Sequence, residues 1–211
     1  MQGGATGWSN WGVAGALVAG LLVSLPISEA SAQQRQAAFL GEMGATSAPI
    51  GWRQFCRDFP ADCQARPAQI ELVRSDRANW AALTRINAHV NTAIEPVTDM
   101  DQYGVEEHWT YPISGRGDCE DYVLLKKQML IRAGFPASAL LITVVRDRKG
   151  DGHAILTVRT DRGDYVLDNE TDEIRLWSQT GYRFVKRQSE TDPDRWVTIG
   201  PASAPAAVAS Q

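Results

Sequence analysis

After Pro136 the chain changes from helical to strand periodicity, and this change most constrains its fold. Three β-rich runs separated by tight turn clusters lie at residues 140–145, 154–158 and 165–167. Shorter candidates lie at residues 174–177, 182–187 and 196–199. Connections this short favour antiparallel pairing, so the second half of the chain predicts an antiparallel sheet.

The first half has helical patterns instead. One helix is predicted from about Asp76 to Ile94, with Ser75 as N-cap, because apolar residues recur there every three to four positions. A second is predicted from about Cys119 to Ala133, ended by Gly134. Helices first and strands second indicate an α+β domain with N-terminal helices packed on an antiparallel sheet. The aromatic stretch 99–117 is expected to form a cleft wall beside the second helix.

Bulk composition excludes some functions. The 211 residues carry a net charge of −4, and no Lys/Arg block or Gly-rich phosphate loop occurs. The sequence therefore predicts no nucleic-acid partner.

The start of the chain resembles an export signal. The uncharged apolar run from Val13 to Leu25 is too short to span a bilayer comfortably, and Pro26 breaks it. Ala30-Ser31-Ala32 then offers the small-x-small pattern of a cleavage site, so residues 1–32 are predicted to be a signal peptide. No Lys or Arg precedes the run, which leaves an uncleaved anchor or a misassigned start as alternatives.

The rest of the chain divides by composition. Residues 33–49 are predicted to be a linker or loose arm, and residues 50–200 to be one folded domain. The Ala/Ser/Pro-rich residues 201–211 are predicted to be a disordered tail.

Cysteine usage agrees with export. Cys56 and Cys63 bracket a short segment in which Pro60 favours a turn, and an oxidising compartment would join the two sulfurs. A metal pair lacks partners, because no second Cys or His pair has ligand spacing. A local disulfide is therefore predicted, which leaves Cys119 as the odd thiol.

Cys119 is the candidate nucleophile. It lies between Asp118 and Glu120 where a glycine-containing loop gives way to the second helix. A helix N-terminus offers unpaired N–H groups and the positive end of the dipole, which favour a thiolate. The alternative is a small buried cysteine with Asp118 as an ordinary N-cap.

His153 is the candidate base, because it follows a Gly-containing turn and opens a strand. His108 in the aromatic stretch is the other candidate, whereas His89 beside the buried stripe of the first helix is expected to be a surface or packing residue.

A third group should orient the imidazole. Asp168 ends the next strand, and a turn at Arg162-Gly163 would place it on the same face as His153. On that register, however, Asp168 lies about 13 Å from His153 along the strand, and Asp172 would be nearer. Both carboxylates remain candidates from register alone.

Four segments carry a family likeness: Trp109-Thr110-Tyr111-Pro112, Gly117-Asp118-Cys119-Glu120-Asp121-Tyr122, Gly152-His153-Ala154 and Leu167-Asp168-Asn169. They resemble the bacterial transglutaminase-like cysteine proteinases, over roughly residues 50–190. The resemblance implies a papain-like/transglutaminase-like core in which Cys119 is the nucleophile, His153 the general base and acid, and Asp168 the orienting carboxylate. It also implies calcium as a cofactor, with Asp118 and Glu120 as ligands.

The expected function is an exported cysteine peptidase that hydrolyses peptide bonds of a periplasmic or cell-surface protein through an acyl-enzyme. The resemblance implies a protein substrate of the surface-adhesin type and a Gram-negative periplasm, with no membrane span after signal cleavage. Two alternatives stay open: acyl transfer of the transglutaminase type, and a non-catalytic periplasmic binding module that retains the fold.

Overall fold

A computed structural model of the chain describes residues 1–4, 7, 38–65 and 69–199. Within these ranges the six predicted strands and an unpredicted one, β1, form one seven-stranded sheet in the order β1-β9-β8-β4-β5-β6-β7. Its strands are β1 (Glu42–Thr46), β4 (Leu140–Arg146), β5 (Gly152–Thr160), β6 (Gly163–Leu167), β7 (Arg175–Leu176), β8 (Arg183–Gln188) and β9 (Trp196–Ile199). Every neighbouring pair is antiparallel, as predicted.

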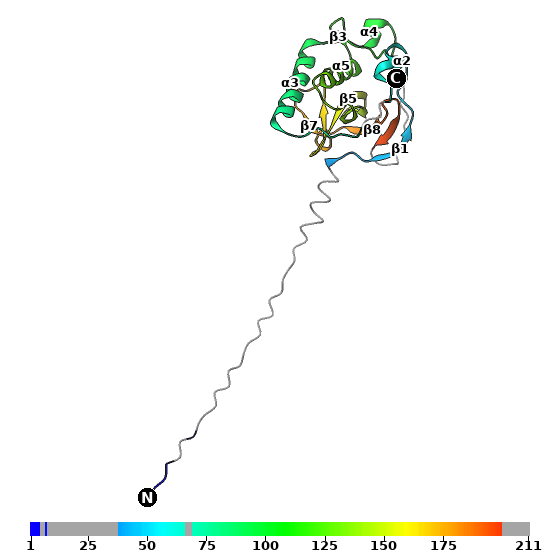
Figure 1. Ribbon diagram of the computed structural model, residues 1–211. Coiled ribbons are helices and arrows are strands. Elements are labelled where there is room, and N and C mark those ends of the chain that lie inside the picture. Colours follow the sequence, from blue (N-terminus) through cyan, green and yellow to red (C-terminus); the bar gives the residue numbers. More distant parts are fainter. Residues whose placement is uncertain (5–6, 8–37, 66–68, 200–211) are drawn as a thin grey trace.

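Two long helices are stacked on this sheet (Figure 1). α5 (Cys119–Arg132) packs on β5, and α3 (Arg77–Ala93) packs on α5. The predicted α+β arrangement is confirmed. Shorter elements are α2 (Ile50–Asp58), α4 (Asp99–Tyr103), the parallel pair β2 (Glu95–Pro96) and β3 (Arg116–Gly117), and the 3-10 turns η1 (Pro60–Asp62), η2 (Ala137–Ala139) and η3 (Trp177–Gln179).

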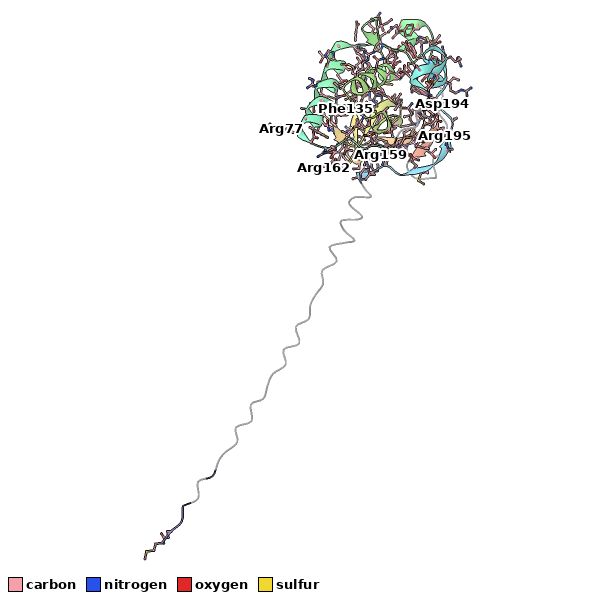
Figure 2. All side chains as sticks on the ribbon, in the orientation of Figure 1. Arg77, Phe135, Arg159, Arg162, Asp194 and Arg195 are labelled. Atoms are coloured by element: carbon pink, nitrogen blue, oxygen red, sulfur yellow. A yellow bond between two sulfur atoms is a disulfide. The ribbon has the colours of Figure 1, made fainter. Side chains whose placement is uncertain are left out.

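The long helices begin and end within one or two residues of their predicted bounds. Asp76, not Ser75, is the N-cap of α3, and its carboxylate accepts a hydrogen bond from Asn79 N–H at 2.9 Å. Ser75 N–H donates instead to Asp161 in the β5–β6 turn, at 2.8 Å. Figure 2 shows Arg77 and Arg162, the neighbours of this contact, at the same end of the domain. Gly134 follows α5 with φ +91°, the left-handed conformation that ends many helices.

The core lies between the helices and one face of the sheet. Leu83 and Val90 of α3, Leu130 of α5, and Leu156 and Val158 of β5 are all buried in it. A smaller apolar cluster covers the opposite face of the sheet: Leu40, Val145, Ile155, Val166, Phe184 and Ile199. The alternation along β5 thus buries both faces, as expected for a central strand.

The register between β5 and β6 differs from the predicted one by two residues. Thr160 pairs with Gly163, so the turn lies at Asp161-Arg162 rather than at Arg162-Gly163. The segment before α3 explains the shift, because Val73 pairs with Thr160 and its carbonyl accepts the N–H of Asp161 at 3.0 Å. A shift of two keeps every side chain on its predicted face.

The folded region begins earlier than predicted. Residues 42–46, assigned to the linker or loose arm, form edge strand β1 beside β9. The buried guanidinium of Arg187 holds this strand through Glu42, at 3.1 Å, and Leu40 N–H donates to Asp164 at 2.8 Å. Long-range pairing, not local propensity, makes this polar, Gly-containing segment a strand.

The N-terminal cysteines are joined as predicted. A disulfide links Cys56 to Cys63. Cys56 lies in the last turn of α2, a helix that the sequence pattern does not predict. Trp52 and Phe55 of α2 are fully buried in the core. The disulfide therefore ties this packed helix to the turn η1 behind it.

Two predicted segments lie outside the described residues. The signal peptide (1–32) does so apart from residues 1–4 and 7, and the disordered tail (201–211) does so entirely. Among the described residues, none of the helices has the length and apolar character needed to cross a membrane.

Candidate active site

The start of α5 is where the candidate nucleophile lies. Cys119 is the first residue of the helix and Asp118 occupies the N-cap position. The carboxylate of Asp118 makes no capping bond to α5; its Oδ2 accepts the N–H of Asp99 at 3.3 Å instead. The helix therefore leaves its first N–H groups without a side-chain cap, and the interpretation of Asp118 as an ordinary N-cap is wrong.

The thiol of Cys119 lies between an acid and a strand. Sγ accepts the backbone N–H of Ala154 at 3.4 Å and donates to Glu120 Oε2 at 3.1 Å. Burial of the thiol, together with the nearby charges of Glu120 and Asp118, raises the pKa of Cys119 well above its usual value. These acids therefore hold the proton on sulfur unless their charge is compensated.

His153 and Asp168 are in direct contact. His153 Nε2 and Asp168 Oδ1 are 2.9 Å apart, and both side chains are buried. The two-residue register shift accounts for this contact. The last pair of β5 and β6 is Leu156 with Leu167, so Asp168, the next residue, comes level with Ile155 rather than Thr157. This halves the distance along the strand that separated Asp168 from His153 on the predicted register.

The alternative carboxylate lies elsewhere. Asp172 Oδ1 accepts the side-chain amide of Asn91 on α3 at 2.7 Å. Asn91 also donates to the backbone oxygen of Asp168 at 2.9 Å, so it fixes the loop that carries both acids. Geometry thus selects Asp168 as the partner of His153.

The two remaining histidines have other surroundings. His89 is exposed on α3, as expected of a surface residue. The backbone N–H of His108 donates to Asp99 Oδ2, and its ring lies edge-on against Tyr103 with centroids 4.5 Å apart. His108 therefore belongs to the acidic side of the site, whereas Cys119 Sγ contacts the residue next to His153.

Three carboxylates gather beside the thiol. Asp99, Asp118 and Glu120 each offer an oxygen, and the three oxygens lie within 4.8 Å of one another. Burial first and the Asp99 charge second raise the pKa of Asp118 to about 6, and burial together with the Asp118 charge raises that of Glu120. Asp118 Oδ1 is buried without a hydrogen-bond partner among the described residues. Oxygen-only donors with excess negative charge suit a hard cation such as calcium.

Asp99 had not been singled out from the sequence. It begins the short helix α4, inside the stretch 99–117 for which no helix was predicted, and its side chain is buried. Its contact with Asp118 spans 19 positions. The local signal that could have found it is Thr98, which caps α4 by accepting Asp101 N–H at 3.2 Å.

The aromatic stretch is partly core rather than cleft wall. Trp109 is buried, and a Cβ at Gly51 of α2 would lie 2.1 Å from its ring. Asp121, one residue after Glu120, accepts the N–H of Thr110 at 2.9 Å. This segment therefore anchors the start of α5 to α2, and exposed positions such as Tyr103 are left to form any wall.

A cavity of about 460 Å³ lies behind α5. Trp52, Tyr111, Leu124 and Ile131 are among its lining residues, but Cys119, His153 and Asp168 are not. The candidate catalytic residues therefore lie at the N-terminal end of α5 and do not line this cavity.

Comparison with known proteins adds an independent finding. The family model of the bacterial transglutaminase-like cysteine proteinases (BTLCP) matches residues 42–204. No curated protein matches the chain. Among solved structures, calcium-bound Legionella pneumophila LapG is similar, with 22% identity, a TM-score of 0.50, and coverage of 62% of this chain and 75% of that chain. EGTA-treated LapG is similar with 23% identity, a TM-score of 0.49, and coverage of 58% and 72%. The family match and the first likeness confirm the predicted papain-like/transglutaminase-like core.

Proposed function

The chain belongs to the bacterial transglutaminase-like cysteine proteinases, and we propose that it cleaves an exported protein through a Cys119-His153-Asp168 triad. As a member of this family it is a cysteine peptidase, so its substrate is a protein. The observation that carries the triad proposal is the joint placement of Cys119 Sγ at 3.4 Å from Ala154 N and of His153 Nε2 at 2.9 Å from Asp168.

The proton moves in a defined order. Asp168 engages Nε2 of His153, so Nδ1 is the ring nitrogen that accepts the Cys119 proton. The thiolate attacks the peptide carbonyl, and His153 then gives the proton to the leaving amine as the C–N bond breaks. His153 then takes a proton from water, and the water oxygen attacks the thioester carbonyl. The C–S bond breaks, the acid product leaves, and the imidazolium returns its proton to the Cys119 sulfur.

The oxyanion that forms when the thiolate attacks the carbonyl needs a hydrogen-bond donor. The N–H of Cys119 lies in the first turn of α5, where backbone N–H groups have no acceptor within the helix, and we assign it this role. The indole of Trp109 is not the second donor, because its Nε1 already donates to Glu107 at 2.9 Å.

Calcium fits the acidic cluster. Asp99, Asp118 and Glu120 would hold it, and the unpartnered Oδ1 of Asp118 gives it a buried ligand atom. A bound cation would compensate the negative charge that raises the pKa of Cys119. Legionella pneumophila LapG, to which this chain is similar, has been solved with calcium bound, which supports the choice of metal.

Export is part of the proposal. The apolar run and small-residue cleavage pattern of residues 1–32 support a signal peptide. The Cys56–Cys63 disulfide supports an oxidising compartment such as the periplasm. A surface adhesin is the substrate class that the family resemblance favours.

The test uses the full chain and a Cys119→Ala variant on periplasmic and outer-membrane protein fractions with calcium present. Mass spectrometry should find new peptide N-termini with the wild type and none with the variant, whose melting temperature should stay within a few degrees. Ser138→Ala, at the cavity behind α5, is the control and should cleave normally.

The same experiment separates the alternatives. Ammonia release with isopeptide formation would identify acyl transfer through the same thioester. Cleavage by Cys119→Ala would refute the nucleophile, and capture of a protein without cleavage by the wild type would indicate a binding module.

A further inference from the structure

We propose that Tyr182 is a positioning residue that holds Asp168 against His153. This inference rests on the proposed triad. The hydroxyl of Tyr182 donates to Asp168 Oδ2 at 2.6 Å, while Asp168 Oδ1 accepts from Glu170 N–H at 3.1 Å and lies 2.9 Å from His153 Nε2. Oδ1 therefore has two partners, and Oδ2 is held by the Tyr182 hydroxyl.

The carboxylate is held on a buried side chain. Asp168 is 2% exposed, so an oxygen left without a donor would carry a desolvation cost. Burial alone would raise the pKa of Asp168, but the bonds from His153 and Tyr182 and the Glu170 N–H together lower it. Tyr182 thus helps to keep the carboxylate ionised beside the imidazole.

Tyr182 contacts both His153 and Asp168. Its ring lies edge-on against the imidazole of His153, with centroids 5.7 Å apart and an interplanar angle of 77°. The hydroxyl also lies 3.1 Å from Glu170 Oε2, but a single proton serves one acceptor at a time. The contact with Asp168 is shorter and its acceptor is buried, so Asp168 takes the proton.

Tyr182 is itself anchored. Its backbone N–H donates to Thr180 Oγ1 at 3.1 Å, and the Thr180 carbonyl accepts from the Arg148 guanidinium at 2.9 Å. Gly181 between them has φ +77° and packs over Arg148, where a Cβ would lie 3.1 Å from Nε. Arg148, in the connection between β4 and β5, therefore helps to fix the backbone that carries the Tyr182 ring.

The loop carrying Asp168 has a separate support. Asn91 of α3 binds the Asp168 carbonyl at 2.9 Å, and Asn87 donates to the carbonyl of Asp172 at 3.2 Å. Removing the Tyr182 hydroxyl should leave this backbone in place and free only the carboxylate to rotate. A rotated Asp168 would no longer hold His153 in the tautomer with the proton on Nε2.

The experiment compares Tyr182→Phe with Tyr111→Phe in the full chain. Tyr111 is the matched control, because its hydroxyl also donates to an aspartate, Asp62, at 3.1 Å, outside the site. For Tyr182→Phe we expect kcat on the cleaved substrate to fall about tenfold with KM little changed, as for a misplaced catalytic group. Tyr111→Phe should keep wild-type kcat, and both melting temperatures should stay within a few degrees.

Two further readouts identify the positioning role. Nitrogen-15 NMR of neutral His153 should report the Nε2–H tautomer in the wild type and a tautomer mixture in Tyr182→Phe. In an Asp168→Ala background, Tyr182→Phe should cause no additional loss of kcat, because the hydroxyl acts through the carboxylate.

An unchanged tautomer in Tyr182→Phe would overturn the inference, as would an equal loss of kcat with Asp168 absent. The NMR measurement needs no peptidase activity. A tautomer change in a chain that cleaves nothing would therefore refute the proposed function and leave the role of Tyr182 standing.

Discussion

At the scale of single residues, Lys126 is a lysine buried in the core. It lies on α5, is fully buried, and its Nζ has no hydrogen-bond partner in the part of the chain that the structure describes. Burial lowers the pKa of Lys126 to about 7, against the opposing charges of Asp168 and Asp172. The pKa of a lysine in the unfolded chain is about 10.4. Above about pH 7 the unfolded chain therefore binds more protons than the folded one.

Stability should therefore rise with pH through this window. Between about pH 7 and 9 the wild type should gain on the order of 2 kcal/mol in unfolding free energy relative to Lys126→Met. Urea unfolding at both pH values measures the difference. Lys149→Met, at an exposed turn, should track the wild type. Parallel pH profiles for wild type and Lys126→Met would show that the lysine is not the titrating group.

The site residues differ in how far the sequence alone could predict them. Cys119 and His153 could be proposed from the sequence because a helix start and a strand start are local signals, and the structure places the Cys119 thiol against Ala154, the residue after His153. The Asp168 contact needed a register that the turn residues misplaced by two. Asp99 and Tyr182 were missed because their contacts, with Asp118 and Asp168, exist only after distant segments meet.

At the scale of elements, the chain is tightly packed at Gly117, just before α5 begins. A Cβ at Gly117 would lie 2.5 Å from Asp121 Oδ2, the same carboxylate group that holds Thr110 N–H. Gly117→Ala should therefore displace the start of α5, lower stability by about 1–3 kcal/mol and reduce cleavage. Thermal unfolding and substrate cleavage measure both effects.

Gly41→Ala supplies the comparison, because a Cβ there meets nothing within 4 Å. It should unfold and cleave like the wild type. Equal melting temperatures for the two variants would mean that the Gly117 contact relaxes without cost.

Elements were predictable where apolar residues form a continuous run or a helical stripe and the turns are short. β4 and β5 are buried along nearly their whole length, and α3 has a regular apolar stripe. β1 and α2 escaped prediction because an ion pair between Glu42 and the buried Arg187 and a disulfide at Cys56 hold them against the rest of the fold. Neither constraint is a periodic signal.

At the scale of the whole molecule, the acidic cluster joins separate parts of the chain. Asp99 comes from α4, whereas Asp118 and Glu120 flank the nucleophile on α5. A cation held by all three should stabilise the folded state by mass action, by about 2.7 kcal/mol at 100 times its Kd. The melting temperature should then exceed that in EGTA by about 5 °C or more.

Asp118→Asn should abolish most of this difference, as measured by differential scanning calorimetry. Asp101→Asn removes a charge from α4, the helix that carries Asp99, but outside the cluster, and this variant should retain the calcium response. A calcium response that survives Asp118→Asn would place the ion elsewhere.

The reactivity of the Cys119 thiol decides whether His153 activates it. Iodoacetamide labelling at neutral pH with calcium present, followed by intact mass, gives the alkylation rate of the one free cysteine among the described residues. We expect the wild type to react at least about tenfold faster than His153→Ala, because only the wild type has a base for the thiol proton. Equal rates in the two proteins would contradict the proposed pair of nucleophile and base.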